Sequence, residues 1–323
     1  MKKQKSQYKQ ISLSKIKTIS IANRKSKVQL NDFAKVFDEN NNLFSHFADS
    51  LPHILIANDL RTLVDDIISS RKKNLPVIAM LGAHVIKVGL SPIIIDLIER
   101  NTITGIAMNS AAAIHDTETA LFGNTSEDVA VNLLDGTFGM SKETGEFINN
   151  TLKKYCNETD FGYGEALATE LAKRKAKNTS FSILATCLKK NIPITVHAAI
   201  GTDIIHQQPT MDGAATGEMS FRDFKIFANA VKEIKGGGVV LNIGSAVILP
   251  EVFLKALTVA RNLGFKANGF TTAVFDMNLH YRPTQNVMLR PTQGNGKGFY
   301  FVGHHEIMIP LLAAMIKSKI ENR

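Results

Sequence analysis

Two kinds of hydrophobic pattern alternate along the chain. Helical spacing of apolar residues is clear in Leu60, Leu63, Val64, Ile67 and Ile68. Segments of strand length, mostly apolar, occupy residues 76–81, 104–108, 193–197, 239–242, 269–275 and 299–302. Residues 76–81 are predicted to form a buried strand.

Helices are predicted between these strands. They fall at residues 93–99, 126–133, 143–155, 162–190 with a break near Asn178, 220–235, 250–262 and 307–320. Ser91 and Ser220 are interpreted as N-caps, residues 31–50 as a short helix and loop, and residues 276–298 as a long irregular loop. Because strands and helices alternate, we predict an α/β fold with a Rossmann-like, largely parallel sheet and helices on both faces.

Charge divides the chain into two parts. The 323 residues carry a formal net charge of +9, and residues 1–27 hold nine Lys or Arg and no Asp or Glu. Nine minus nine leaves the remainder close to neutral. We therefore expect a single domain at residues 29–323 and a basic N-terminal arm at residues 1–28. The arm could be a flexible arm, a targeting segment or a strap between subunits.

Composition excludes several classes of protein. A near-neutral body argues against a nucleic-acid-binding face, and no apolar run approaches the ~20 residues needed to span a membrane. The two cysteines, Cys156 and Cys187, have neither metal-ligand spacing nor a disulfide framework, which favours a reducing compartment. We expect a cytoplasmic protein that binds neither membranes nor nucleic acids.

Polar and glycine residues follow five of the predicted strands. In a parallel sheet the carboxyl ends of the strands share one edge, where ligands bind. In chain order these residues are Gly82, His84, Lys87 and Gly89; Ser110, Ala111, His115 and Asp116; Gly201, Thr202, Asp203 and His206; Gly244 and Ser245; and Asp276, His280 and Arg282. We therefore predict a ligand site at this edge.

The stretch from Met108 to Glu118 carries the clearest of these signals. A strand, four small residues and a helix start would let a ligand approach backbone N–H groups. Asp116 could then accept a hydrogen bond from a ribose hydroxyl. The alternative is a tight turn with an acid near the helix N-terminus, which stabilises any helix. Residues 236–238 resemble a phosphate cradle, but they precede a strand and by themselves predict a turn.

Other catalytic constellations are weaker. His304 and His305, with Glu306 and His280, suggest a metal cluster, but adjacent histidines diverge on most backbones, so no metal is expected. The sequence contains no Walker loop, Gly-x-Ser-x-Gly elbow or Cys–His nucleophile pair. Arg222 and Asp223 are interpreted as ordinary surface residues of a helix.

Taken in order, these segments resemble deoxyhypusine synthase over residues 50–291, most clearly over residues 192–291. Residues 83–89 lie where that family has a Ser-Asn-x-x-Ser-Ser-Gly segment, and residues 110–116 resemble its Thr-Ala-Gly-Gly-Val-Glu-Glu. Gly201-Thr-Asp203 resembles the family's Thr-Asp turn, and Gly236-Gly-Gly-Val-Val240 resembles its Gly-Gly-Gly-Val-Val run. Thr272-Ala-Val-Phe-Asp276 resembles its Thr-Ala-Gln-Glu-Phe-Asp run with one residue missing, and Arg282-Pro283 resembles its Arg-Pro pair. Residues 110–116 are also similar to a His-Asp turn in NAD-using ornithine cyclodeaminase-type enzymes.

The resemblance implies an NAD-binding domain and a homotetramer with sites at dimer interfaces. The cofactor-binding residues would be His84, Lys87, Gly89, Ser110, Ala111, Asp116, Gly236, Gly237, Gly238, Thr272, Ala273 and Asp276. Asp116 would take the place of the acid that holds the cofactor ribose. The catalytic set would be His115, Asp203, Asn242 and His280. Asp203 and Asp276 would hold a cationic substrate, and His115 or His280 would move the proton.

Three departures from that family concern its chemistry. Its imine-forming Lys would fall at Pro291, its catalytic His is replaced by Asn242, and the acid after Arg-Pro is replaced by Gln285. A Schiff base needs a primary amine, which this loop supplies only if Lys297 folds back.

Three functions therefore stay open. The first is an NAD-dependent, transferase-like enzyme that removes a hydride from a nitrogen-bearing carbon of a small amine or amino acid, after which an amine or water attacks the imine. The second is deoxyhypusine synthase itself, which transfers the aminobutyl group of the polyamine spermidine to a protein lysine. The third is a non-catalytic module that binds NAD or another ligand.

Overall fold

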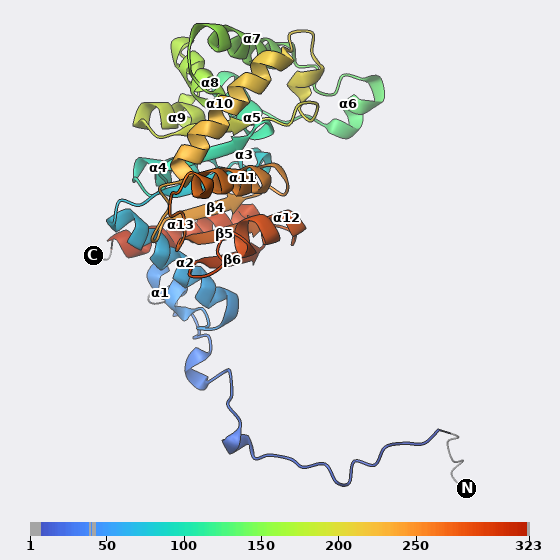
Figure 1. The fold of residues 1–323 in the computed structure, drawn as a ribbon, viewed down its shortest axis with the longest axis vertical. Coiled ribbons are helices and arrows are strands. Elements are labelled where there is room, and N and C mark those ends of the chain that lie inside the picture. The colour runs from blue at the N-terminus through green and yellow to red at the C-terminus, as the bar shows by residue number, and fades with distance from the viewer. Residues whose placement is uncertain (1–7, 39, 41–42, 322–323) are drawn as a thin grey trace.

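The computed structural model describes residues 8–38, 40 and 43–321, which contain a six-stranded sheet (Figure 1). The strands are β1 (Val77–Leu81), β2 (Gly105–Asn109), β3 (Ile194–His197), β4 (Val239–Ile243), β5 (Thr271–Asp276) and β6 (Lys297–Val302). Their order is β3-β2-β1-β4-β5-β6, and every neighbouring pair is parallel. The predicted fold class is confirmed, and each predicted strand is present.

Helices connect the strands. The α-helices are α1 (Phe44–Ser50), α2 (Leu55–Lys72), α3 (Ala83–Lys87), α4 (Ser91–Glu99), α5 (Ser110–Phe122), α6 (Val129–Asp135), α7 (Lys142–Glu158), α8 (Tyr163–Lys173), α9 (Ile183–Lys190), α10 (Gly213–Val231), α11 (Ile248–Asn262), α12 (Tyr281–Pro283) and α13 (His305–Glu321). Short 3-10 helices are η1 (Ile21–Asn23), η2 (Leu30–Asp32), η3 (Thr179–Phe181) and η4 (Ile204–Gln207), and η5 (Thr284–Leu289) is a π-helical segment. No helix in this described part of the chain is long and apolar enough to cross a lipid bilayer.

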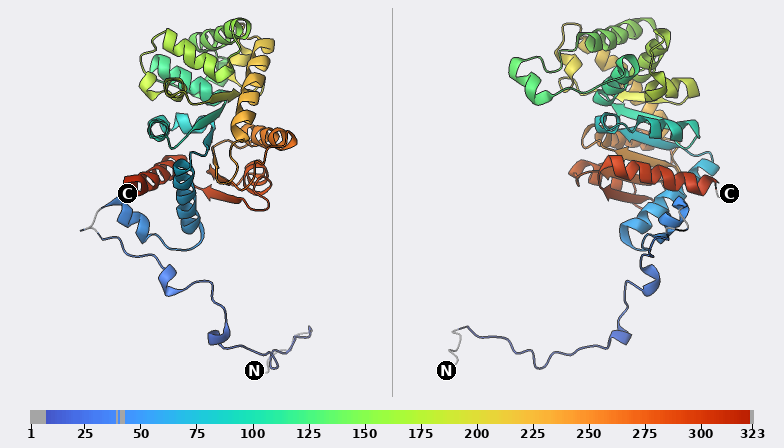
Figure 2. Two further views of the ribbon diagram at one scale, coloured as in Figure 1. Left: turned by 60° about the vertical axis from the view of Figure 1, so that its left-hand side comes forward. Right: turned by 180° about the vertical axis from the view of Figure 1, so that it is seen from behind.

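The two faces of the sheet pack against different helices (Figure 2). In β1, Val77, Ala79 and Leu81 belong to a core that includes α2, α4 and α13. Ile78 and Met80 belong to a second core with α10 and α11. Successive side chains of a strand point to opposite faces, so coverage of both faces explains why β1 is apolar at every position.

Some predicted boundaries were wrong. Helix α10 begins at Gly213 rather than Ser220, because Asp212 caps it by accepting the Ala215 N–H at 2.9 Å. Glycines have low helix propensity, and two of them in this first stretch concealed the helix. The N-cap of α4 is Leu90 rather than Ser91. The segment that was predicted to be an irregular loop, residues 276–298, contains α12 and η5.

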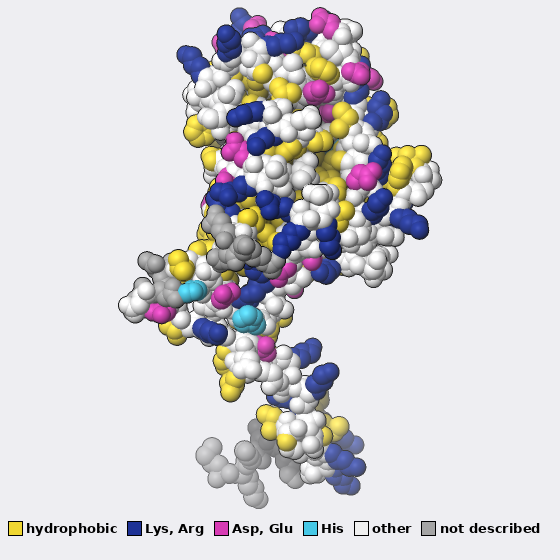
Figure 3. Space-filling view, turned by 90° about the vertical axis from the view of Figure 1, so that its left-hand side faces the viewer, with side chains coloured by type: hydrophobic (Ala, Val, Ile, Leu, Met, Phe, Trp, Pro, Cys, Tyr) yellow, Lys and Arg dark blue, Asp and Glu magenta, His cyan; other side chains and the backbone are white. Residues whose placement is uncertain are grey.

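The described part of the basic arm extends away from the sheet and carries cationic and apolar side chains side by side (Figures 1 and 3). Residues 1–7, with three of the nine basic residues, lie outside the described part. The described cations of the arm are Lys9, Lys15, Lys17, Arg24, Lys25 and Lys27. Apolar neighbours such as Ile11 and Ile19 are exposed by 88% and 76%, so the arm does not pack on the described body.

Asp223 is not the surface residue that its helical position suggested. Its Oδ2 accepts the backbone N–H of Gly164 at 2.9 Å and of Val196 at 2.6 Å, which ties α10 to α8 and β3. The side chain is fully buried, and burial raises its pKa to about 8 although the backbone hydrogen bonds oppose the rise. Asp223 is therefore mainly protonated, and neutral, at pH 7.

Stability should fall as the pH rises through the pKa of Asp223. A pKa raised from 3.8 to about 8 on folding means that the protonated form favours the folded state. This contribution is complete below about pH 4 and is lost as the pH rises through 8. The wild-type protein should lose unfolding free energy between pH 5 and 8.5. In Asp223→Asn, whose side chain does not titrate in this range, we expect this loss to be smaller by about 1 kcal/mol or more. Urea denaturation at both pH values measures this, and an unchanged pH dependence would contradict it.

Candidate functional site

The strand order reverses between β1 and β4, and α/β sheets bind ligands beyond the carboxyl ends of the strands at such a switch point, which we call the crevice. Gly82 follows β1 and Gly244 follows β4, and Gly82 donates its N–H to the Ile243 carbonyl at 2.8 Å. A Cβ on Gly82 would lie 2.0 Å from the Gly244 carbonyl oxygen. Gly244 has φ +70°, a left-handed conformation that favours glycine. The floor of the crevice is therefore formed by the closely packed backbone of Gly82, which is buried, and of Gly244, which is partly exposed.

Histidines and carboxylates surround this crevice. The rings of His84, in α3, and His305, at the start of α13, have centroids 5.5 Å apart. His305 is buried, and its Nε2 lies 3.1 Å from the Phe275 carbonyl oxygen, which only accepts, so we assign the proton to Nε2. Burial and the neighbouring His305 lower the pKa of His84, while Glu306 and Asp276 act in the opposite direction. His84 is therefore neutral at pH 7.

Asp276 and His280 form a pair at the carboxyl end of β5. The His280 Nε2 lies 3.4 Å from Asp276 Oδ1, which also accepts the Asn278 N–H at 3.2 Å. The Tyr300 hydroxyl accepts the His280 N–H at 3.0 Å and donates to the Asn278 carbonyl at 2.7 Å. The side chain of His280 is 38% exposed, against 8% for Asp276. The buried carboxylate therefore orients an accessible imidazole, whose Nδ1 is left for a ligand.

A cavity of about 350 Å³ opens between α5, the α6 segment and the turn that follows β3. Its apolar walls include Ile114, Phe122 and Phe138. Its polar lining includes Lys87, His115, Glu118, Thr125, Thr144 and Asp203. A cavity near the lower end of the range for small-molecule sites fits a small metabolite or half of a dinucleotide.

The polar residues on α5 are linked to the segment that follows it. Glu118 accepts the Thr144 hydroxyl at 2.9 Å through Oε1, and Oε2 accepts the Thr125 hydroxyl. The Thr125 oxygen lies 2.7 Å from His115 Nδ1. Burial, followed by the charge of Lys87, lowers the pKa of His115 to about 4. These bonds hold one wall of the cavity in place.

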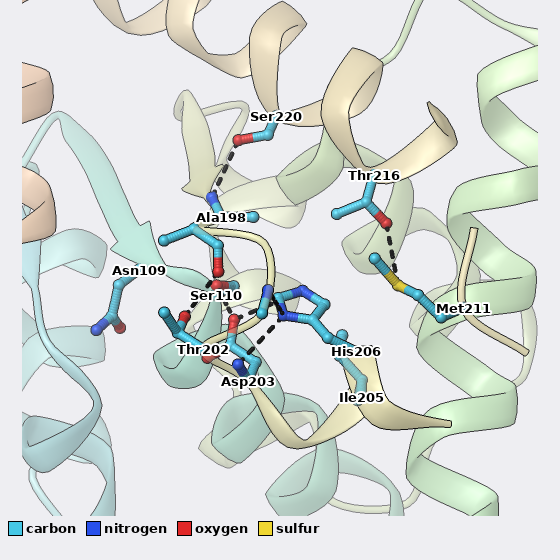
Figure 4. A network of polar contacts seen from close by, with 12 residues as sticks. Asn109, Ser110, Ala198, Thr202, Asp203, Ile205, His206, Met211, Thr216 and Ser220 are labelled. Carbon is cyan, nitrogen blue, oxygen red and sulfur yellow. Dashed lines mark hydrogen bonds and ion pairs between the residues drawn. The ribbon is translucent and has the colours of Figure 1, made fainter. Parts of the chain in front are cut away.

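Asp203 lies at the opposite wall, in the turn after β3. Figure 4 shows Ser110, the first residue of α5, directed at Asp203, whose Oδ2 accepts the Ser110 hydroxyl. His206 Nδ1 accepts the backbone N–H groups of Gly201 and Asp203, each at 3.1 Å, so its proton is on Nε2, 3.8 Å from Asp203 Oδ2. Burial raises the pKa of Asp203, while its bond with Ser110 opposes the rise.

Eight of the predicted site residues gather at this edge of the sheet. They are His84, Lys87, Ser110, Ala111, His115, Asp203, Asp276 and His280. Ser110 is fully buried, so neither its side chain nor its backbone is accessible to a ligand. The catalytic and binding roles of these residues stay predictions.

Asp116 points away from this edge, which corrects its predicted contact with a ribose. Its carboxylate accepts the Ser182 hydroxyl at 2.6 Å and the backbone N–H groups of Ile183 at 2.7 Å and Leu184 at 3.1 Å. The side chain is fully buried, and burial raises its pKa to about 6. Asp116 therefore binds the N-terminus of α9 and cannot reach a ligand at the sheet edge.

The three glycines at 236–238 lie at the opposite edge of the sheet, before β4. Gly236 donates its N–H to Asn268 at 2.9 Å, and the Gly237 carbonyl accepts the Ser70 hydroxyl. Gly238 donates to Ile234 at 3.0 Å. These bonds form the tight turn that leads into β4, so the predicted contact of Gly236, Gly237 and Gly238 with a cofactor at the carboxyl edge is wrong.

Four other predicted residues do not face the crevice either. Thr272 and Ala273 are buried inside β5, where the Thr272 hydroxyl donates to the Val287 carbonyl at 2.9 Å. Asn242 is fully buried in β4 and donates to the Ser245 carbonyl at 2.9 Å, so it shapes the turn beside the crevice. Gly89 lies beyond α3, where its φ of +78° closes a turn.

Several residues at the site were missed. Glu118, Thr125 and Thr144 come from α5 and the segments after it, and His305, which was considered only for a metal cluster, lies beside the crevice. The spacing of His115 and Glu118, three residues apart on a predicted helix, was the one available signal, because such residues share a face.

Comparison with known proteins identifies similar folds but does not assign the chain to a family. No protein-family model matches the chain, and no curated protein matches its sequence. A putative LOR/SDH protein from Methanococcus maripaludis S2 is 17% identical with a TM-score of 0.53, over 81% of this chain and 70% of that one. A putative deoxyhypusine synthase from Entamoeba histolytica is 13% identical with a TM-score of 0.53, over 88% and 96%.

AgrE in a ternary complex with ornithine and NAD⁺ also has this fold. It is 12% identical with a TM-score of 0.53, and the match covers 82% of this chain. The chain spans about a third of the length of AgrE, since 33% of that protein is covered. At these identities the similarities show a shared fold with deoxyhypusine synthase-like proteins.

Proposed function

We propose that this protein is an NAD-dependent enzyme that oxidises a nitrogen-bearing carbon of a small amine or amino acid to an imine. The observation that carries the proposal is the crevice at the β1–β4 switch point, with its glycine floor and the Asp276–His280 pair on its rim. Structures of the same fold support this class of activity, since one of them holds ornithine and NAD⁺.

The residues at the crevice fit a dinucleotide. Gly244 is partly exposed and carries no side chain, so a cofactor could approach the backbone at this position. Lys87 ends α3 beside the crevice and offers a cation to a pyrophosphate. When bound, NAD supplies the hydride acceptor for the oxidation.

The Asp276–His280 pair can prepare the substrate for oxidation. An ammonium cannot lose a hydride from its carbon until it gives up a proton. His280 Nδ1 would take this proton, and Asp276 would stabilise the imidazolium through Nε2–H. The freed nitrogen lone pair then forms the C=N bond as the hydride leaves, so the product is an iminium ion.

Lysine modification through an enzyme-bound imine finds no support in the loop before β6. Lys297 begins β6, at the edge opposite the crevice, and its Nζ binds both carboxylate oxygens of Asp66 at 2.8 and 2.9 Å. Pro291, which takes the place of the family's lysine, is buried. Since this loop supplies no amine to the crevice, we do not propose deoxyhypusine synthase activity.

Binding and turnover can be tested together. We expect calorimetry to show saturable binding of NAD, and absorbance at 340 nm to show NADH formation with some members of a panel of cationic amines and amino acids. His280→Gln should lower kcat by roughly 100-fold, because general-base catalysis is lost, and should keep NAD affinity. His46→Gln, on the exposed surface of α1, is the matched control. Absence of NAD binding at millimolar concentration would refute the proposal.

A further inference from the structure

The cavity beside the crevice has a wall that accepts hydrogen bonds. The Thr125 hydroxyl gives its one proton to Glu118, so its oxygen must accept from His115 Nδ1, 2.7 Å away. This arrangement leaves His115 Nε2 as a bare acceptor. Because the pKa of His115 is lowered to about 4, the ring remains neutral at pH 7. Each Glu118 oxygen uses one lone pair on a threonine and keeps another for a ligand.

Lys87 connects this cavity to the crevice. It lines the cavity, and its charge lowers the pKa of His115 in the cavity and of His84 at the crevice. It therefore stands between the two sites. A ligand that occupies both would place its middle beside this cation, as a dinucleotide places its pyrophosphate.

The other carboxylates near the cavity are engaged in holding the chain. Glu127 accepts the Gly139 N–H at 2.9 Å and the Asn132 amide at 2.7 Å, which shapes the α6 segment. Asp116 is occupied by the N-terminus of α9. Asp203 also lines the cavity, and its Oδ2 accepts the Ser110 hydroxyl. Glu118, whose side chain is 12% exposed, accepts only from threonine side chains that line the cavity.

We infer that the cavity holds the adenosine half of the cofactor and that Glu118 restricts the enzyme to NAD over NADP. The inference rests on the proposed function. A diol donates hydrogen bonds, which suits an acceptor-rich wall, and an acid that binds the ribose 2′-hydroxyl is how Rossmann folds select NAD. A 2′-phosphate would add about −1.5 to −2 charges beside Glu118. Among the described lining residues, Lys87 is the one Lys or Arg, and it stands toward the crevice.

Calorimetric titration of the full chain with NAD and NADP tests this selectivity. We expect wild-type protein to bind NAD at least about 100-fold more tightly, from repulsion between phosphate and carboxylate. Glu118→Gln should reduce this ratio by about tenfold or more, and Glu143→Gln, an exposed residue of α7, should leave it unchanged. The fragments 5′-AMP and 2′,5′-ADP should show the same preference, since they probe the adenosine half alone.

The outcomes separate this inference from the proposed function. Equal affinity of wild-type protein for NAD and NADP, or an unchanged ratio in folded Glu118→Gln, would overturn the inference and leave NAD dependence standing. If neither NAD nor NADP binds, both the inference and the proposed function are overturned. If circular dichroism shows that Glu118→Gln does not fold, the wild-type titrations with 5′-AMP and 2′,5′-ADP decide, and equal affinity for these two fragments counts against the inference.

Discussion

Replacement of Gly82 by alanine is expected to separate the ends of β1 and β4 and to abolish cofactor binding. The added methyl would lie 2.0 Å from the Gly244 carbonyl oxygen and 3.1 Å from the Ser245 nitrogen. Both are backbone atoms, so no side chain can rotate away. Gly82 has φ −81°, which alanine also adopts, so the effect is purely steric. We expect unfolding free energy to fall by at least about 3 kcal/mol, as in severe overpacking.

Gly105→Ala is the matched control for this substitution. Gly105 begins β2 and is buried, but its Cβ would meet only the Ile78 side chain, at an ordinary 3.6 Å. Urea denaturation of both variants measures their unfolding free energies, and NAD titration measures their cofactor affinities. A Gly82→Ala protein as stable as Gly105→Ala, with NAD affinity unchanged, would show that the crevice floor is not as tight as described.

Asp116→Ala should destabilise the protein strongly, and the cause should be lost hydrogen bonds within the protein rather than lost cofactor binding. The substitution leaves the Ser182 hydroxyl and the N–H groups of Ile183 and Leu184 buried without an acceptor. Unsatisfied buried donors cost about 1–3 kcal/mol each, partly relieved by relaxation, so we expect a loss of about 3 kcal/mol in unfolding free energy. Chemical denaturation at pH 7 measures this loss.

The same variant separates two roles for Asp116. If Asp116 binds the ribose, the variant should lose NAD affinity and keep its stability. If Asp116 instead holds the N-terminus of α9, the variant should be less stable and its folded fraction should still bind NAD. Asp135→Ala, at the exposed end of α6, is the control and should change neither quantity by much. A stable Asp116→Ala protein with weakened NAD binding would reverse our assignment.

Asp116 and Glu118 show why the ribose-binding acid could not be chosen from the sequence. Both carboxylates belong to one predicted helix that follows β2. Residues two apart on an α-helix point about 200° apart, so if one faces a ligand the other faces the protein. The choice depends on what packs behind the helix, and α9, which supplies that contact, lies more than sixty residues away in sequence.

Asp223 makes the same point for buried polar residues. Its helix was predicted, but a carboxylate on an α-helix is predicted to be a surface residue unless its hydrogen-bond partners are known. Those partners, Gly164 and Val196, lie on α8 and β3. Backbone donors have no signature in a sequence, so long-range hydrogen bonds of this kind become visible only when the chain is folded.

The sequence by itself determined the strands, the parallel sheet and the edge at which its candidate ligand site lies. These features depend on local patterns, because alternating strands and helices favour a parallel sheet and parallel strands place all their carboxyl ends together. The tertiary structure alone decided which side chains face that edge. It turned Asp116 inward and Glu118 toward the cavity, placed residues 236–238 at the far edge, and brought Gly82 against Gly244. Such choices depend on contacts between distant segments, which residue spacing does not encode.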